Sequence, residues 1–190
     1  MCKDRNMKQE PLAQALSTLL IATEFAAVKH RQQRRKDTDA SPYINHPIAL
    51  ATLLAVEGDV SDVTVLCAAL LHDTIEDTQT TADEIAELLN SAVADLVLEV
   101  TDNKALPKTE RKQLQIDKAP HLSHNAKLIK LADFCSNLTD QLQRPPQDWP
   151  LSRKQDYFDW VARVAAGLRG THAPLEARLD ALLARRVELY

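Results

Sequence analysis

The sequence predicts an all-α protein, residues 1–190 forming a single domain of roughly eight to ten helices. Three observations support this fold class. Only 3 of the 190 residues are glycine, which leaves few positions for the tight turns that join strands. Apolar residues recur at intervals of three and four along most of the chain, whereas the alternation typical of strands is scarce. Aromatic residues make up 4 % of the chain, so the core must be mainly aliphatic.

Capping residues and prolines indicate where each helix begins and ends. Nine helices are expected. In chain order they are 11–29, 47–57, a helix capped by Ser61, 81–90, 91 to about 102, 107–119, 123–142, 152–168 and 174–187. The charged stretch 30–39 and the SPYIN segment are expected to form a loop. Thr81 and Glu84 form a capping box, and the Pro145-Pro146 pair bars helix continuation. No repeat or linker interrupts this series, which supports one domain.

Charge and cysteine content narrow the class of protein. The net charge of −4 argues against binding to DNA or RNA polymers, although a local basic pocket for a small anion is compatible with it. Cys2, Cys67 and Cys135 lie far apart, which is typical of small apolar residues rather than of disulfides or zinc ligands. We find neither an apolar leader nor an uninterrupted apolar run of membrane-spanning length. We therefore expect a cytoplasmic protein with no membrane partner.

The segment HDTIEDT brings one histidine and three carboxylates together. His72 and Asp73 follow the apolar run VTVLCAALL, and an ionised carboxylate is rarely buried there without a partner. A divalent cation such as Mn, Fe, Co or Zn accepts imidazole and carboxylate together. Glu76 and Asp77 lie three and four residues after Asp73 and project from the same side if the helix continues. An exposed acidic run is the alternative interpretation.

A second acidic residue lies far along the chain in AKLIKLADFCSNLTD. Lys130, Asp133 and Asn137 fall along one stripe of the predicted helix, and a solvated polar stripe explains this spacing equally well. His46, in INHP, stands at a predicted helix start. Taken alone, it is more typical of a structural histidine than of a metal ligand.

Six stretches of the chain share the pattern of a known family. In order they are FAAVKHRQQRRKD, SPYINHPIALA, AALLHDTIEDTQTT, EVTDNKALPKTERKQLQ, AKLIKLADFCSNLTD and, more weakly, DYFDWVARVAAGLRGT. They resemble the stand-alone hydrolases of the RelA/SpoT homologue group within the HD-domain superfamily, especially the small animal-type SpoT homologues and their bacterial counterparts. The resemblance covers about residues 20–172.

This resemblance implies an all-helical HD fold that holds one Mn²⁺ ion or another borderline divalent ion. The family pattern carries over four metal ligands, His46, His72, Asp73 and Asp133, and two catalytic acids, Glu76 and Asp77. The implied reaction is removal of the 3′-pyrophosphate from guanosine alarmones, (p)ppGpp, giving GDP or GTP and pyrophosphate. A divalent metal suits this chemistry because it lowers the pKa of a bound water. The roles of the two acids are not divided by the sequence.

The resemblance also implies residues that bind the nucleotide. Arg35 and Lys36 would frame it, Asn137 would contact its sugar or base, and Tyr157 would close the pocket. Guanidinium groups suit phosphate oxygens, although a solvated basic helix end explains any single cation of HRQQRRK, including Arg31 and Arg34. A plain exposed helix is the preferred interpretation of four further cations, with the mouth of the site as the alternative: Lys104, Lys108, Arg111 and Lys112.

One residue departs from the family pattern. Phe134 stands where members usually carry Lys or Arg, and we expect the missing cation to alter phosphate contacts or the pKa of a nearby carboxylate. Two alternatives stay open. The first is a broader HD-type nucleotide phosphohydrolase acting on NADPH or adenosine alarmones, and the second is a catalytically silent nucleotide-binding regulator. A small nucleotide is the expected partner, and the sequence does not determine the oligomeric state.

Overall fold

The computed structural model describes residues 3–189 and confirms the all-α class. The helices are α1 (Lys3–Lys29), α2 (Asn45–Thr52), α3 (Val63–Leu71), α4 (Thr74–Asp77), α5 (Ala82–Leu88), α6 (Ser91–Val100), α7 (Lys108–Lys118), α8 (His124–Gln143), α9 (Leu151–Ala166) and α10 (Ala173–Ala184). A π-helical turn, Leu53–Glu57, extends α2, and short 3₁₀ turns follow α7 and α10. Within 3–189, extended pairing is limited to one isolated bridge between Arg34 and Pro42.

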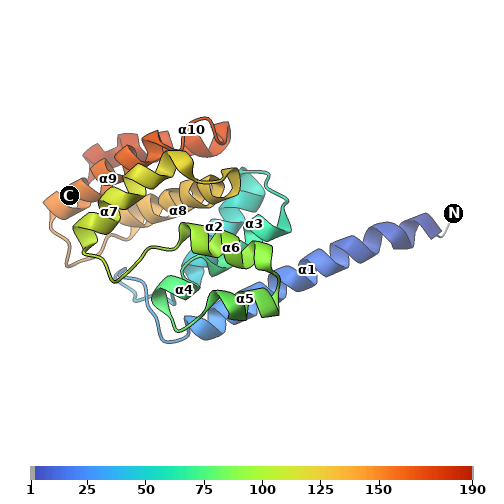
Figure 1. Cartoon of the computed structure of the whole chain (residues 1–190). Coiled ribbons are helices and arrows are strands. Elements are labelled where there is room, and N and C mark those ends of the chain that lie inside the picture. The colour runs from blue at the N-terminus through green and yellow to red at the C-terminus, as the bar shows by residue number, and fades with distance from the viewer. Residues whose placement is uncertain (1–2, 190) are drawn as a thin grey trace.

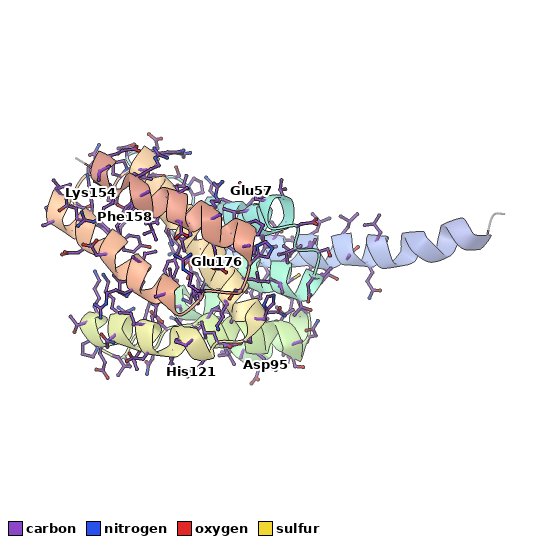
Figure 2. All side chains as sticks on the ribbon, turned by 90° about the horizontal axis from the view of Figure 1, so that it is seen from above. Glu57, Asp95, His121, Lys154, Phe158 and Glu176 are labelled. Carbon is purple, nitrogen blue, oxygen red and sulfur yellow. The ribbon has the colours of Figure 1, made fainter. Side chains whose placement is uncertain are left out.

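Helices α3 and α8 form the centre of the domain (Figure 1). Every residue of α3 from Val65 to Leu71 is buried, because α1, α2, α6 and α8 all pack around it. Helix α8 contacts α2, α6, α9 and α10 as well. Figure 2 shows α9 from above, with Phe158 labelled on it. Phe134 and Phe158 are the largest fully buried side chains, and burying each contributes about 2 to 3 kcal/mol.

Helix α1 has a packed half and a projecting half. Its buried residues Ala22 and Ala26 lie in the core, where α1 contacts α3. Leu12, Leu16 and Leu20 are more than half exposed, and Figures 1 and 2 both show this end of the helix extending beyond the other helices. The packed half therefore anchors the segment that follows α1.

By length and composition alone, Leu12–Lys29 is apolar enough to cross a membrane, with a mean hydropathy of 1.3 over 18 residues. Polar residues such as Gln14 and Ser17 interrupt the run, and Ala22 and Ala26 in its second half are buried in the core. The absence of a membrane partner stays a prediction.

Most predicted helices are present with starts shifted by a residue or two, but the start of the first helix and two capping residues were wrong. Helix α1 begins before Pro11, at Lys3. Asp62 rather than Ser61 caps α3, and Asn90 rather than Ser91 caps α6, with side-chain oxygens that accept backbone N–H bonds at 2.8 and 3.0 Å. Neighbouring residues of equal capping propensity compete, and the backbone conformation of the folded chain selects one. The caps at Thr81 and Ser123 are confirmed.

The cysteine prediction is confirmed for the two residues that the structure describes. Cys67 and Cys135 are both fully buried and free. Burial raises the pKa of both thiols, to about 11 for Cys67 and about 12 for Cys135. Both therefore stay protonated and behave as small core residues. Cys2 lies outside the described residues.

The cap of α3 provides a test of the corrected helix start. We expect Asp62→Ala to lower the free energy of unfolding by about 1 kcal/mol, because it removes the acceptor for the Thr64 N–H. Ser61→Ala is the matched control and should change the free energy by less than about 0.5 kcal/mol. Urea unfolding followed by circular dichroism measures both, and equal losses would contradict the assignment.

Candidate metal centre and active site

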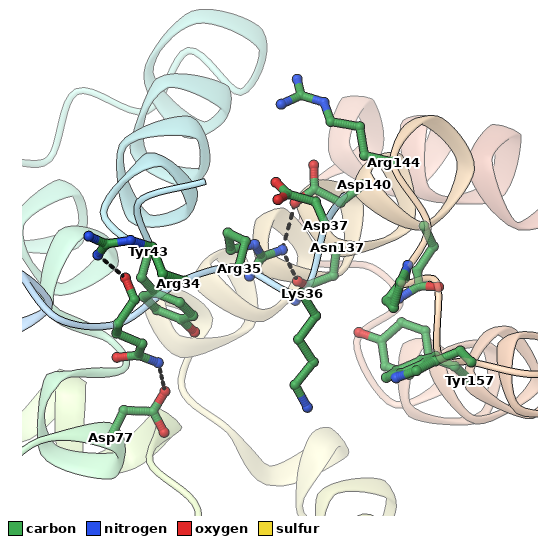
Figure 3. A pocket seen from close by; sticks show the side chains of 14 residues that line it. Arg34, Arg35, Lys36, Asp37, Tyr43, Asp77, Asn137, Asp140, Arg144 and Tyr157 are labelled. Carbon is green, nitrogen blue, oxygen red and sulfur yellow. Dashed lines mark hydrogen bonds and ion pairs between the residues drawn. The ribbon is translucent and has the colours of Figure 1, made fainter. Parts of the chain in front are cut away.

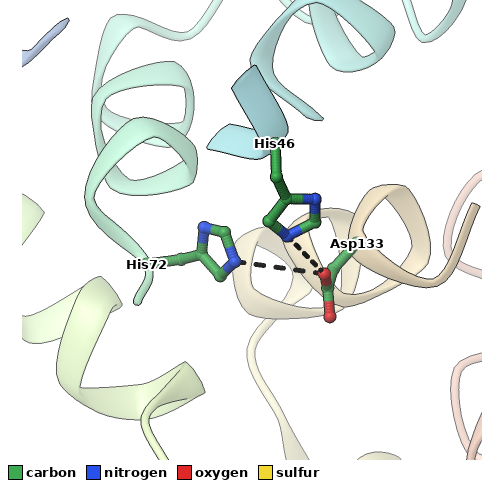
Figure 4. Close-up of side chains that lie close together, drawn as sticks. All are labelled: His46, His72 and Asp133. Atoms are coloured by element: carbon green, nitrogen blue, oxygen red, sulfur yellow. Dashed lines mark ion pairs between the residues drawn. The ribbon is translucent and has the colours of Figure 1, made fainter. Parts of the chain in front are cut away.

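Two histidines and two aspartates converge where α2, α3 and α8 meet. His46 lies in the first turn of α2, His72 and Asp73 directly follow α3, and Asp133 lies in the middle of α8. The ligand atoms of His46, His72 and Asp133 lie within 4.8 Å of one another (Figure 4). His46 Nε2 is 3.1 Å from Asp133 Oδ1, and His72 Nε2 is 2.9 Å from Asp73 Oδ2. Each imidazole lies within 3.9 Å of the other aspartate as well.

Hydrogen bonds on the outer nitrogens orient both imidazoles. His72 Nδ1 donates to the carbonyl oxygen of Ala69 at 2.8 Å, and His46 Nδ1 lies 3.1 Å from Ser136 Oγ. Both Nε2 atoms therefore face the centre. His72 Nε2 is buried, and despite its short distance to Asp73 it has no hydrogen-bond partner of acceptable geometry among the described residues. An imidazole held through Nδ1 with an unpartnered Nε2 is the arrangement that metal ligands adopt.

The two aspartates are also held from outside the centre. The Tyr43 hydroxyl donates to Asp73 Oδ2 at 2.5 Å. The Asn137 amide donates to Asp133 Oδ1 at 2.6 Å, so two residues of the polar stripe predicted on this helix are hydrogen-bonded to each other. Only 19 % of the Asp73 side chain and 16 % of the Asp133 side chain are exposed. Each of these donors bonds to the carboxylate oxygen that lies nearest an imidazole.

Mutual interactions decide how the two buried imidazoles and the two partly buried carboxylates ionise. Burial of His72 lowers its pKa, but Asp73 outweighs this effect and raises the pKa to about 9. Burial raises the pKa of Asp73, yet His72 holds it well below its usual range. The pKa of Asp133 is likewise lowered, because His46 outweighs burial, while burial lowers the pKa of His46. The centre therefore holds two ionised carboxylates, and a divalent cation would complete a mixed imidazole and carboxylate site by displacing the proton of His72.

The acid pair lies beside this centre on the short helix α4. Glu76 Oε2 accepts the backbone N–H of Asp102 at 3.1 Å, and burial raises the pKa of Glu76. Asp77 accepts a bond from Gln33 at 2.7 Å and forms an ion pair with Lys104. The break after α3 did not separate these acids from the centre, because α4 resumes at once. Asp77 is thus held by two donors, whereas Glu76 accepts one backbone N–H and lies 3.8 Å from Arg111 and 3.9 Å from Lys104.

A cleft of about 320 Å³ opens beside the centre and holds all four predicted substrate residues (Figure 3). Arg35 donates to Asn137 at 3.0 Å and to Asp140 at 2.6 Å, so its guanidinium is fixed. Lys36 is exposed and extends between Asp77 and Tyr157. The residues that line this cleft are Gln33, Arg34, Arg35, Lys36, Asp37, Tyr43, Asp77, Asn137, Asp140, Gln141, Arg144, Pro146, Trp149 and Tyr157.

A second cleft of about 200 Å³ shares Trp149 and Tyr157 with the first. Helix α7 is exposed, as expected, and its cations Lys108, Arg111 and Lys112 line this cleft, which favours the alternative that they lie at the mouth of the site. Burial and the neighbouring cations lower the pKa of Lys108. Like charges gathered in this way favour an anionic ligand. Lys104 forms ion pairs with both acids, and Arg111 also lies 3.8 Å from Glu76 Oε1.

Comparison with known proteins identifies the family. Residues 22–181 match the HD domain family. Guanosine-3′,5′-bis(diphosphate) 3′-pyrophosphohydrolase MESH1 of Homo sapiens is 54 % identical over 168 residues, covering 88 % of this chain and 94 % of that protein. The chain belongs to the HD-domain family of RelA/SpoT homologues.

Two further comparisons support membership of the same family. The protein of the same name from Drosophila melanogaster is 48 % identical over 163 residues, covering 86 % of this chain and 91 % of that protein. A solved structure described as a metazoan ortholog of SpoT that hydrolyses ppGpp and plays a role in starvation responses matches with a TM-score of 0.87 at 47 % identity. That match covers 89 % of this chain and 95 % of the other, so the predicted family and fold are confirmed.

Phe134, the departure from the HD-family pattern, lies away from both clefts. Its side chain is 1 % exposed and packs edge-on against Trp160, with ring centroids 5.6 Å apart. The position points into the core between α8 and α9, so a substitution there acts on the second cleft only through Trp160, which lines it. The expected direct effect on phosphate contacts is not supported by this geometry.

Several residues around the centre formed by the two histidines and two aspartates were not predicted from the sequence. Gln33 and Tyr43 lie inside the quoted motifs, but a glutamine and a tyrosine carry no chemical signal there. Trp149 and Arg153 stack at 4.1 Å beside the shared wall of the clefts, and they come from the Pro-rich turn before α9 and from its start. Only the folded chain brings these segments to the site.

The geometry of the two histidines and two aspartates leads to a prediction about metal binding. We expect Asp73→Ala to weaken binding of a divalent cation by more than about 100-fold, because it removes a carboxylate that faces both imidazoles. Isothermal titration calorimetry measures this loss, and Glu76→Ala is the control that should keep its affinity. Undiminished binding by Asp73→Ala would rule out Asp73 as a ligand.

Proposed function

We propose that this protein hydrolyses the 3′-pyrophosphate of guanosine alarmones such as ppGpp, with Mn²⁺ held by His46, His72, Asp73 and Asp133. The observation that carries the proposal is the convergence of these side chains beside an acid pair and two cation-lined clefts. Relatives about 50 % identical over most of the chain bear the name of this activity. Mn²⁺ suits a donor set that mixes imidazole nitrogen with carboxylate oxygen.

The clefts fit a nucleotide that carries phosphates at two positions. One group of cations, which includes Lys36, lies in the first cleft beside Asp77, and the other group lines the second cleft. Trp149 and Tyr157 stand between them, 6.0 Å apart in a T-shaped arrangement. Aromatic faces accept a base or a sugar, and cations on either side accept phosphate oxygens. The separation of the two groups favours a substrate with two phosphate ends.

The reaction breaks the bond between O3′ and the adjoining phosphorus. A bound divalent cation supplies a water of lowered pKa and neutralises phosphate charge. Glu76 accepts the proton of the attacking water, since burial raises its pKa toward the range of a general base. The water oxygen bonds to phosphorus, O3′ leaves and takes up a proton, and pyrophosphate is released. Asp77, held by Gln33 and Lys104, orients the water.

The decisive measurement is pyrophosphate release from ppGpp by the purified protein. We expect turnover with Mn²⁺ and its loss after chelation, with recovery when Mn²⁺ is restored. Glu76→Ala should lower kcat by about 100-fold or more, because a general base contributes at least that factor. The absence of turnover by the wild-type protein with Mn²⁺ would remove the proposal and favour a silent regulator. Parallel assays with NADPH and ppApp test the broader phosphohydrolase.

The cation in the first cleft provides a test of substrate binding. We expect Lys36→Ala to raise KM for ppGpp about tenfold, because a charge-assisted contact to phosphate contributes about 1.5 kcal/mol. Arg31→Ala removes a neighbouring cation that does not line the cleft, and its KM should stay within about twofold. Equal changes in the two variants would indicate only a general effect of charge.

A further inference from the structure

The segment between α1 and α2 contacts two carboxylates of the site at once. Gln33 Nε2 donates to Asp77 Oδ2 at 2.7 Å, and the Tyr43 hydroxyl donates to Asp73 Oδ2 at 2.5 Å. The backbone N–H of Tyr43 donates to the carbonyl oxygen of Gln33 at 3.1 Å, which closes the loop between them. The two side-chain donors therefore stand on one hydrogen-bonded frame.

A buried histidine fixes the amide of Gln33. His30 is 2 % exposed, and its Nδ1 lies 2.7 Å from Gln33 Oε1. An ionised carboxylate only accepts hydrogen bonds, so the NH₂ group of Gln33 faces Asp77 and its oxygen faces His30, which donates. The His30 ring also packs on Tyr43, with ring centroids 4.9 Å apart. The amide cannot turn without losing a hydrogen bond at each end.

The second partner of Asp77 does not provide the same constraint. Lys104 forms an ion pair with Asp77, but its side chain is 48 % exposed. A long, exposed ammonium group neutralises charge without holding a carboxylate in one orientation. Gln33 is planar, bonded at both ends and attached to the end of α1, whose Ala26 is fully buried in the core. The orientation of Asp77 therefore depends on Gln33.

We propose that Gln33 is a positioning residue for hydrolysis, which holds Asp77 in a fixed orientation toward the metal centre while His30 locks its amide. This inference rests on the proposed function. In this proposal Gln33 is not a metal ligand and takes no direct part in proton transfer. Turnover therefore depends on Gln33 through Asp77, whereas metal binding does not depend on it.

The test compares Gln33→Leu with Gln32→Leu, the same substitution at the exposed neighbouring glutamine. We expect Gln33→Leu to lower kcat for ppGpp by about 10- to 100-fold with KM within about twofold, since a displaced catalytic group costs such a factor. Its Mn²⁺ affinity by calorimetry should stay within about threefold of wild type. Gln32→Leu should match wild type in all three quantities. Gln33→Asn keeps an amide on a shorter side chain and should also lose kcat.

A double-mutant cycle separates positioning from general damage. In an Asp77→Ala background, Gln33→Leu should have little further effect on kcat, because the residue through which it acts is gone. Tyr43→Phe, which loses the donor to Asp73, should instead weaken Mn²⁺ binding by about 10- to 100-fold.

Each other outcome overturns the inference. Unchanged kcat in Gln33→Leu and Gln33→Asn, a rise in KM alone, a loss of Mn²⁺ affinity equal to that of Tyr43→Phe, or full additivity with Asp77→Ala contradicts the role of Gln33 and leaves the proposed function intact. Absence of ppGpp turnover by the wild-type protein overturns the proposed function and this inference together.

Discussion

The burial of two carboxylates against two imidazoles is the constraint around which this domain is arranged. An ionised carboxylate that leaves water loses several kcal/mol of solvation, and this loss is offset only by close partners of fixed geometry. Asp73 and Asp133 find such partners in His72 and His46, which three separate helices must bring within 3.9 Å. Helix α3 is apolar on every side because it lies at the centre of that packing.

A second set of contacts surrounds this centre and determines which atoms face it. Ser136 and the carbonyl oxygen of Ala69 hold the histidines, whereas Tyr43 and Asn137 hold the aspartates. Such outer partners fix the tautomer and direction of a ligand and thereby tune what it binds. Asn137 also accepts from Arg35, so one amide connects the centre to the cleft. Arg35, Asn137 and Asp133 therefore form one chain of hydrogen bonds from the cleft to the centre.

The charges of this protein are distributed unevenly, which allows an acidic protein to bind an anionic substrate. The chain carries a net charge of −4, yet Lys108, Arg111, Lys112 and Arg153 gather around one cleft. A local positive potential of this kind attracts phosphate even when the molecule as a whole is acidic. The core position of Phe134 shows how a departure from a family pattern can leave the site intact, since its ring packs against Trp160 rather than toward the clefts.

Much of the fold was determined by the sequence itself. Three- and four-residue apolar spacing, capping residues and the scarcity of glycine depend on local physics, so they predict helices directly. The doublet of His72 and Asp73 could also be found locally, because charged residues directly after an apolar helix need a partner. The exact capping residue was not predictable at Ser61 and Ser91, since adjacent residues have similar capping propensity and the folded backbone selects one.

Only the tertiary structure brought His46 and Asp133 to that doublet, because their distances depend on how α2 and α8 pack against α3. Spacing alone left both residues ambiguous, and a family resemblance was needed to assign them. Gln33 and Tyr43 carried no signal at all, since a neutral amide and a phenol become functional only through what they touch. The sequence by itself therefore determined the helices and the acidic doublet, whereas the buried centre and its outer donors depend on long-range packing that no local pattern encodes.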